Sequence, residues 1–191
     1  GTGGVMRVDL WDNNNNTRAV TIVAPGTQGF VAGDASRWTP WGTYLTAEES
    51  WSDPNQVASS KGRLFEVTNP TTAGANGANF VHRKIGPADI RVSHEGLAFD
   101  KNNNFYFIDE RDNSHIFKFT SANPNATSGA DFFGAGQTSV LRVGNGMTEE
   151  ATGAYSWIAL TSATGAALPN TIVKTDGNGM PILDGRATPN V

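Results

Sequence analysis

Two short apolar runs joined by a polar turn make up residues 96–108, which read GLAFDKNNNFYFI. The first run, 96–99, has the composition of a short strand, and the wholly apolar 105–108 is typical of a strand inside a sheet. The Asp and Asn residues of 100–104 favour a tight turn between the two runs. Beyond a second turn, residues 115–119 (HIFKF) alternate apolar and polar side chains. The stretch therefore predicts successive short strands joined by tight turns.

The same pattern of strands and turns extends along the chain in both directions. Alternating or apolar runs predict further strands at 5–11, 18–23, 42–48, 62–67, 80–85 and 139–143. The sequence DGNG at 176–179 predicts a hairpin turn between strands at 171–175 and 180–183. Long loops are expected at 26–42, 69–79 and 122–136, and no helix of more than two turns is expected anywhere.

Groups of about four strands over roughly 45 residues fit the blades of a β-propeller. Residues 95–143 form one expected blade and residues 43–85 most of another, with partial blades on either side. We therefore predict an all-β fold, a β-propeller with about three blades in this chain. Because a closed propeller needs typically four to eight blades, residues 1–191 are expected to be part of a single propeller domain. A missing segment or a further chain would complete it.

The composition of the 191-residue chain excludes several classes of protein. It contains 22 Gly and 9 Pro and only 17% charged residues, unlike a helical bundle or coiled coil. No apolar stretch approaches the roughly 18–20 residues of a membrane span. The net charge of −4 without a basic patch argues against a nucleic-acid surface. The chain has no Cys, which excludes disulfides and thiol nucleophiles.

Carboxylates gather at the ends of three expected strands. The five residues are Glu48 and Glu49, Glu95, and Asp109 and Glu110. Adjacent acids at strand ends can supply ligands to hard cations such as calcium. The competing interpretation is a set of solvated surface acids, with an ordinary bridge from Asp109 or Glu110 to Arg111. Residues 100–104 match the first half of a calcium loop, but Phe105 replaces its Gly, so we predict a hairpin turn there.

Several of these segments resemble the PhoX-type alkaline phosphatase family. Residues 39–49, TPWGTYLTAEE, resemble the family signature T-P-W-G-T-W/Y-L-T-C-E-E, which is specific. Residues 62–67 and 94–100 resemble the strand after that signature and an E-G-x-A-x-D motif, and 105–119 resembles the next pair of strands. The later motifs also occur in propellers of the gluconolactonase type. The resemblance covers roughly residues 36–160.

This resemblance implies a six-bladed propeller with metals in its central channel. Members of the family are exported phosphomonoesterases that use calcium together with iron. Carried over by position, Glu48 and Glu49 match the metal-binding end of the signature. Glu95 matches a calcium-site glutamate of the family. Asp109 and Glu110 lie where the family's channel-facing acids are expected. Calcium is the cofactor that the resemblance predicts. Ala47 stands where the family has a Cys that ligates iron, and a methyl group cannot replace a thiolate, which sets the iron site and known phosphatase activity in question.

Two main functional hypotheses follow. The first is an exported phosphomonoesterase, in the periplasm, secreted or at the surface of a bacterial cell, that hydrolyses small phosphate esters with calcium and another metal. No residue is assigned as its nucleophile. The alternative is a non-catalytic extracellular propeller that serves as a binding or structural surface, which Ala47 favours. A third hypothesis, a lactonase-like propeller, explains the segment 94–100 but not the segment 39–49.

Overall fold

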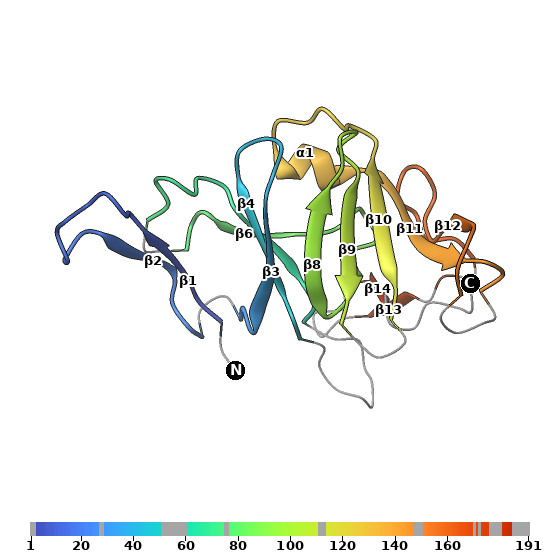
Figure 1. Ribbon diagram of the computed structural model, residues 1–191, viewed down its shortest axis with the longest axis horizontal. Coiled ribbons are helices and arrows are strands. Elements are labelled where there is room, and N and C mark those ends of the chain that lie inside the picture. Colours follow the sequence, from blue (N-terminus) through green and yellow to red (C-terminus); the bar gives the residue numbers. More distant parts are fainter. Residues whose placement is uncertain are drawn as a thin grey trace.

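Mostly antiparallel β-sheets dominate the computed structural model (Figure 1). The structure describes residues 3–26, 29–50, 61–74, 77–110, 114–146, 151–169, 171, 173–175 and 181–184. Two of the sheets are blades. The first blade has the order β3-β4-β5-β6, and its strands are β3 (Gly33–Trp38), β4 (Tyr44–Glu48), β5 (Leu64–Val67) and β6 (Phe80–Arg83). All neighbouring strands in it are antiparallel.

The second blade has five strands, because one further strand joins the four that residues 95–143 predict. Its order is β12-β11-β10-β9-β8, with β8 (His94–Phe99), β9 (Phe105–Asp109), β10 (Ile116–Ser121), β11 (Gly136–Val143) and β12 (Tyr155–Ala159). In both blades the chain therefore moves strand by strand from one edge of the sheet to the other. The prediction of an all-β fold with propeller-like blades is confirmed.

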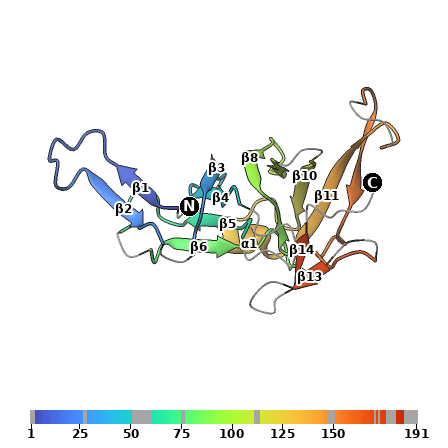
Figure 2. The ribbon, with the colours of Figure 1, turned by 90° about the horizontal axis from the view of Figure 1, so that it is seen from below.

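Two smaller sheets flank the blades. A two-stranded sheet, β1 (Val5–Val8) and β2 (Ala19–Val23), lies at one end of the molecule (Figure 2). A three-stranded sheet pairs β13 (Val173–Thr175) with β14 (Pro181–Asp184) and β14 with β7 (Ile90–Arg91). The expected hairpin of residues 171–183 is thus present, although its DGNG turn lies outside the described residues. No helix in the described ranges is long and apolar enough to cross a membrane.

Both faces of the first blade are buried at its central strands, β4 and β5, as expected for a blade with neighbours. Leu45, Ala47 and Leu64 pack in a core shared with the phenylalanines of the second blade. Phe65 and Val67 join a second core with residues of β2. Because side chains alternate between the faces of a strand, β5 supplies Leu64 to one core and Phe65 to the other.

Two expected loops contain regular structure. Residues 33–38 lie in the expected loop 26–42 but form β3. The loop prediction was wrong there because Ala35 is the only buried side chain of the strand. A strand of this kind lacks the apolar alternation on which sequence prediction depends. Residues 129–134 of the expected loop 122–136 form the short helix α1 (Gly129–Gly134), which is capped by Ser128 and buries Phe132 and Phe133.

The turn after β8 confirms the hairpin prediction for residues 100–104. Asp100 Oδ1 accepts hydrogen bonds from the backbone N–H groups of Asn102 and Asn104, and Asp100 Oδ2 accepts from Asn104 Nδ2 and from the hydroxyl of Tyr106. These local bonds occupy the carboxylate and fix the turn.

Candidate functional site

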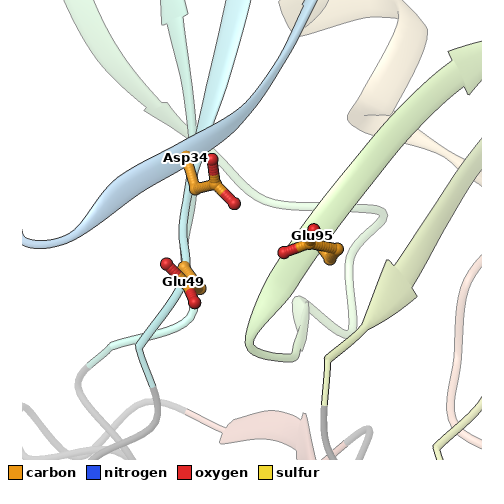
Figure 3. Close-up of side chains that lie close together, drawn as sticks. All are labelled: Asp34, Glu49 and Glu95. Atoms are coloured by element: carbon orange, nitrogen blue, oxygen red, sulfur yellow. The ribbon is translucent and has the colours of Figure 1, made fainter.

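Three carboxylates converge between the two blades. They belong to Asp34 of β3, Glu49 directly after β4, and Glu95 of β8, and one oxygen of each lies within 4.8 Å of the others (Figure 3). Calcium binds oxygen ligands at about 2.3–2.6 Å, so two ligands on opposite sides of one ion are about 5 Å apart. The separation of the three carboxylates therefore fits a single hard cation.

Irregularities in the two facing strands place two of these acids. The pairing of β3 with β4 shifts register between Gly33 and Ser36, which brackets Asp34. The pairing of β8 with β9 shifts between His94 and Leu97, which brackets Glu95. β3 of the first blade and β8 of the second contact each other. Because a β-bulge bends its strand and redirects a side chain, the two shifts can aim both acids at the gap between the blades.

Neighbouring carboxyl groups raise the pKa values of Glu49 and Glu95. A hydrogen bond with the Asp34 carboxyl group, and then its negative charge, raise the pKa of Glu95 above the ordinary value. Glu110 acts in the same two ways on Glu49 and raises its pKa. Glu110 is therefore a fourth acid of the cluster, which we define as Asp34, Glu49, Glu95 and Glu110. Raised carboxylate pKa values mark a place where a proton or a cation relieves repulsion.

The predicted residue Glu48 lies apart from the acidic cluster. It is fully buried, and its carboxylate forms a salt bridge with Arg63, with Nη2 at 2.7 Å from Oε1 and Nε at 3.0 Å from Oε2. The backbone N–H groups of Val31 and Arg63 also donate to it. The Arg63 guanidinium balances the charge of the carboxylate, and the four hydrogen bonds occupy both of its oxygens.

Asp109 also has a structural environment. Its side chain is buried, and Oδ1 accepts a 2.7 Å hydrogen bond from the backbone N–H of Ser93. Of the five acids that the sequence singles out, the structure therefore brings Glu49, Glu95 and Glu110 together and sets Glu48 and Asp109 into the protein interior. Arg111, the expected partner of an ion pair, lies outside the described residues.

Asp34 is the member of the acidic cluster that sequence reasoning missed. It lies in a segment expected to be a loop, where a single acid carries no signal of its own. A usable signal is nevertheless present, because the acids at 34, 48 and 49 recur 61 residues later at 95, 109 and 110. An internal repeat of this kind marks equivalent positions in successive blades.

His94, considered as a ligand or a base, lies in the interior instead. Its side chain has no exposed surface, and its ring packs against Phe107 with centroids 5.6 Å apart. Burial lowers the pKa of His94 to about 3, against an opposing contribution from the backbone of Gly62. Burial likewise lowers the pKa of His82, on β6, to about 4. Both imidazoles are neutral at pH 7.

We expect the two buried histidines to make the protein less stable in acid. Between pH 6.5 and about 4 the unfolded chain binds protons that the folded chain does not, so stability falls as the pH drops, by up to about 1.4 kcal/mol per pH unit for each histidine. Urea unfolding between pH 4.5 and 7 measures this slope. His82→Gln should reduce the slope, and an unchanged slope in that variant would contradict the assignment.

Ala47 lies in the apolar core, fully buried beside Leu45 and Leu64. Its surroundings are those of an aliphatic side chain, and it offers no donor atom. An iron site that uses a thiolate at this position therefore does not fit these residues.

Comparison with known proteins places these features in a family. The family model described as "Alkaline phosphatase PhoX" matches residues 33–184. A solved structure, Pseudomonas fluorescens PhoX in complex with vanadate, a transition state analogue, is similar with 23% identity and a TM-score of 0.46. The match covers 75% of this chain and 31% of that one, so this chain spans less than a third of that structure's length. No match was found among the curated proteins.

Proposed function

The chain belongs to the PhoX alkaline phosphatase family, and on this premise we propose that it acts as a metal-dependent phosphoric-ester hydrolase. The observation that carries the proposal is the convergence of the Asp34, Glu49 and Glu95 carboxylates within 4.8 Å of one another. The substrate class that we propose is a small phosphate monoester.

The donor set suits a hard cation, and we propose calcium. Asp34, Glu49 and Glu95 would bind it, and Glu110 lies close enough to Glu49 to raise its pKa. A cation bound here would polarise a phosphate oxygen and lower the pKa of a bound water. The negative charge of the acids would hold the cation in place. Because the pKa values of Glu49 and Glu95 are raised, protons would compete with the cation for these carboxylates as the pH falls.

Iron held by a thiolate does not form part of the proposal. Ala47 occupies the position of the family's Cys, it is buried among aliphatic side chains, and the chain contains no Cys. Any second metal would need other ligands, and we assign no chemistry to one.

We further propose that residues 1–191 form part of a single propeller domain. The first and second blades, together with the smaller sheets, would belong to one ring that further strands complete. In agreement with the family, we propose that the protein is exported and acts in the periplasm, outside the cell or at its surface.

The proposal is tested by hydrolysis of p-nitrophenyl phosphate after removal of metals with EDTA and addition of calcium. We expect activity that depends on calcium and falls at least tenfold in Glu95→Gln, since loss of a ligand weakens metal binding. Asp131→Asn, which alters an exposed acid on α1, is the matched control and should keep full activity. A folded protein that is inactive with every divalent cation would contradict the proposal.

The alternative is a non-catalytic propeller that serves as a binding or structural surface. Ala47 favours it, because a relative without the family's thiolate ligand lacks one part of the known site. A groove of about 530 Å³ between β1 and the first blade also favours it, since Met6, Leu10, Trp11 and Trp38 expose apolar side chains there. Calcium binding without any hydrolysis would support this alternative.

A further inference from the structure

The two-stranded sheet β1-β2 takes the place of the outer half of a blade. Its strand β2 starts at Ala19, 61 residues before β6, the outer strand of the first blade, starts at Phe80. The inner strands repeat with the same period, since β3 starts at Gly33 and β8 at His94. Because an internal repeat marks equivalent positions in successive blades, β2 is the counterpart of β6. Its partner β1 is then the counterpart of β5.

The packing of this sheet agrees with its place in the repeat. Ile22 and Val23 of β2 are buried in one core with Phe65 and Phe80 of the first blade. This core lies on the opposite face of β5 from the core that the first blade shares with the second. The first blade therefore has a packing partner on each face, as a blade inside a propeller does.

The sheet β1-β2 covers only the outer half of that face. Phe80, Val67, Tyr44 and Trp38 are successive cross-strand partners from β6 to β3, and they form one row on the face. Phe80 and Val67 are buried, Tyr44 is half-buried and Trp38 is 55% exposed. The groove of about 530 Å³ lies here, between β1 and the inner end of the row. The inner half of the row is thus left open.

The same row is covered in the second blade. Phe99 is the counterpart of Trp38, and Phe105 is the counterpart of Tyr44, each 61 residues later and paired in the same way. Phe105 has no exposed surface. Trp41, in the turn between β3 and β4, packs edge-on against Phe99 with ring centroids 5.7 Å apart. The inner hairpin of one blade therefore places a turn aromatic on this row of the next.

β1 also has an open backbone edge beside the row. Its sheet contains two strands, so no strand within the described residues pairs with β1 on the side away from β2. The backbone N–H of Asp9 donates to the carbonyl of Arg18 on the β2 side. Because bonded positions alternate along an antiparallel pair, the backbone groups of Met6 and Val8 point to the open side. An edge of this kind is where a further strand adds, through main-chain hydrogen bonds.

We infer that the open edge of β1 and the uncovered row beside it bind an antiparallel β-hairpin, which takes the place that β3 and β4 have in the first blade. One of its strands pairs with β1. Its turn presents an aromatic side chain to Trp38, as the β3–β4 turn presents Trp41 to Phe99. We assign the hairpin to the rest of the proposed propeller, outside residues 1–191, because both described blades are built from successive strands of one chain. The inference does not depend on the proposed hydrolase activity.

Thiol labelling of the native, full-length protein tests the covered row. Trp38→Cys places a thiol there, and residues 1–191 contain no other Cys, so mass spectrometry of its peptide identifies the product. Asp131→Cys, on the exposed side of α1, is the matched control. We expect maleimide to react at least about a hundredfold more slowly at position 38 than at position 131, since a covered thiol reacts only through local opening.

Hydrogen exchange of the unaltered protein tests the backbone edge and needs no variant to fold. The amides of Met6 and Val8 should exchange within about tenfold of the rate of Arg7, which bonds to β2.

Three outcomes would overturn the inference. The first is equal labelling at positions 38 and 131. The second is exchange at Met6 and Val8 that is about a hundredfold faster than at Arg7. The third is shielding that disappears on dilution together with a dimer in analytical ultracentrifugation, because a second copy would then cover the row. A protein that shields position 38 yet hydrolyses no phosphate ester would contradict the proposed activity and leave this inference intact.

Discussion

Replacing Glu66 by leucine is expected to lower the free energy of unfolding by about 3–5 kcal/mol, because it leaves a partly buried cation and two hydrogen-bond donors without their partner. Glu66 is 1% exposed at the centre of the first blade. Its Oε2 forms a salt bridge with Arg83 Nε, and its Oε1 accepts from Trp41 Nε1 at 2.8 Å and from the hydroxyl of Thr43.

The contribution of the ion pair can be separated from that of the hydrogen bonds. Urea unfolding at pH 7 should show that the double variant Glu66→Leu, Arg83→Met regains part of the lost stability, because no unpaired and partly desolvated charge remains. Glu66→Gln should lose less than Glu66→Leu, since its amide oxygen still accepts from Trp41 and Thr43. A loss below about 1 kcal/mol for Glu66→Leu would show that the carboxylate is dispensable.

Replacing Phe132 by alanine is expected to cost a similar amount, about 3–5 kcal/mol. Phe132 lies on α1 and has no exposed surface. Its ring lies 4.8 Å from that of Trp41 in the first blade, and 5.7 and 5.9 Å from those of Phe99 and Phe119 in the second, between ring centroids. The helix therefore closes the core where the two blades meet, and the variant removes contacts on both sides.

Thermal or urea unfolding of Phe132→Ala measures this loss, with Phe132→Leu as the milder control. Leucine fills most of the volume and should cost only about 1–1.5 kcal/mol. Equal and small losses in the two variants would mean that the space collapses or fills with water and that α1 does not join the blades.

Much of the fold can be predicted from the sequence. The apolar run 105–108 and the alternating run 115–119 are strands of the second blade, and the polar residues 100–104 form the turn between β8 and β9. Local signals suffice here, because side-chain period and turn chemistry act over a few residues. β3 and α1 escaped prediction because their stability comes from pairing and packing with distant parts of the chain.

The candidate site, like the fold, could be predicted from the sequence only in part. Sequence alone determined that acids stand at the ends of three strands, that residues 1–191 contain no thiolate ligand and that the residues around Ala47 resemble a phosphatase signature. It could not distinguish Glu48 from Glu49, two identical neighbours. Only the tertiary structure decided that Glu48 binds Arg63 in the interior and that Glu49 meets Asp34 and Glu95. The physical reason is that adjacent side chains of a strand point to opposite faces, while pairing register and bulges determine which face meets the neighbouring blade.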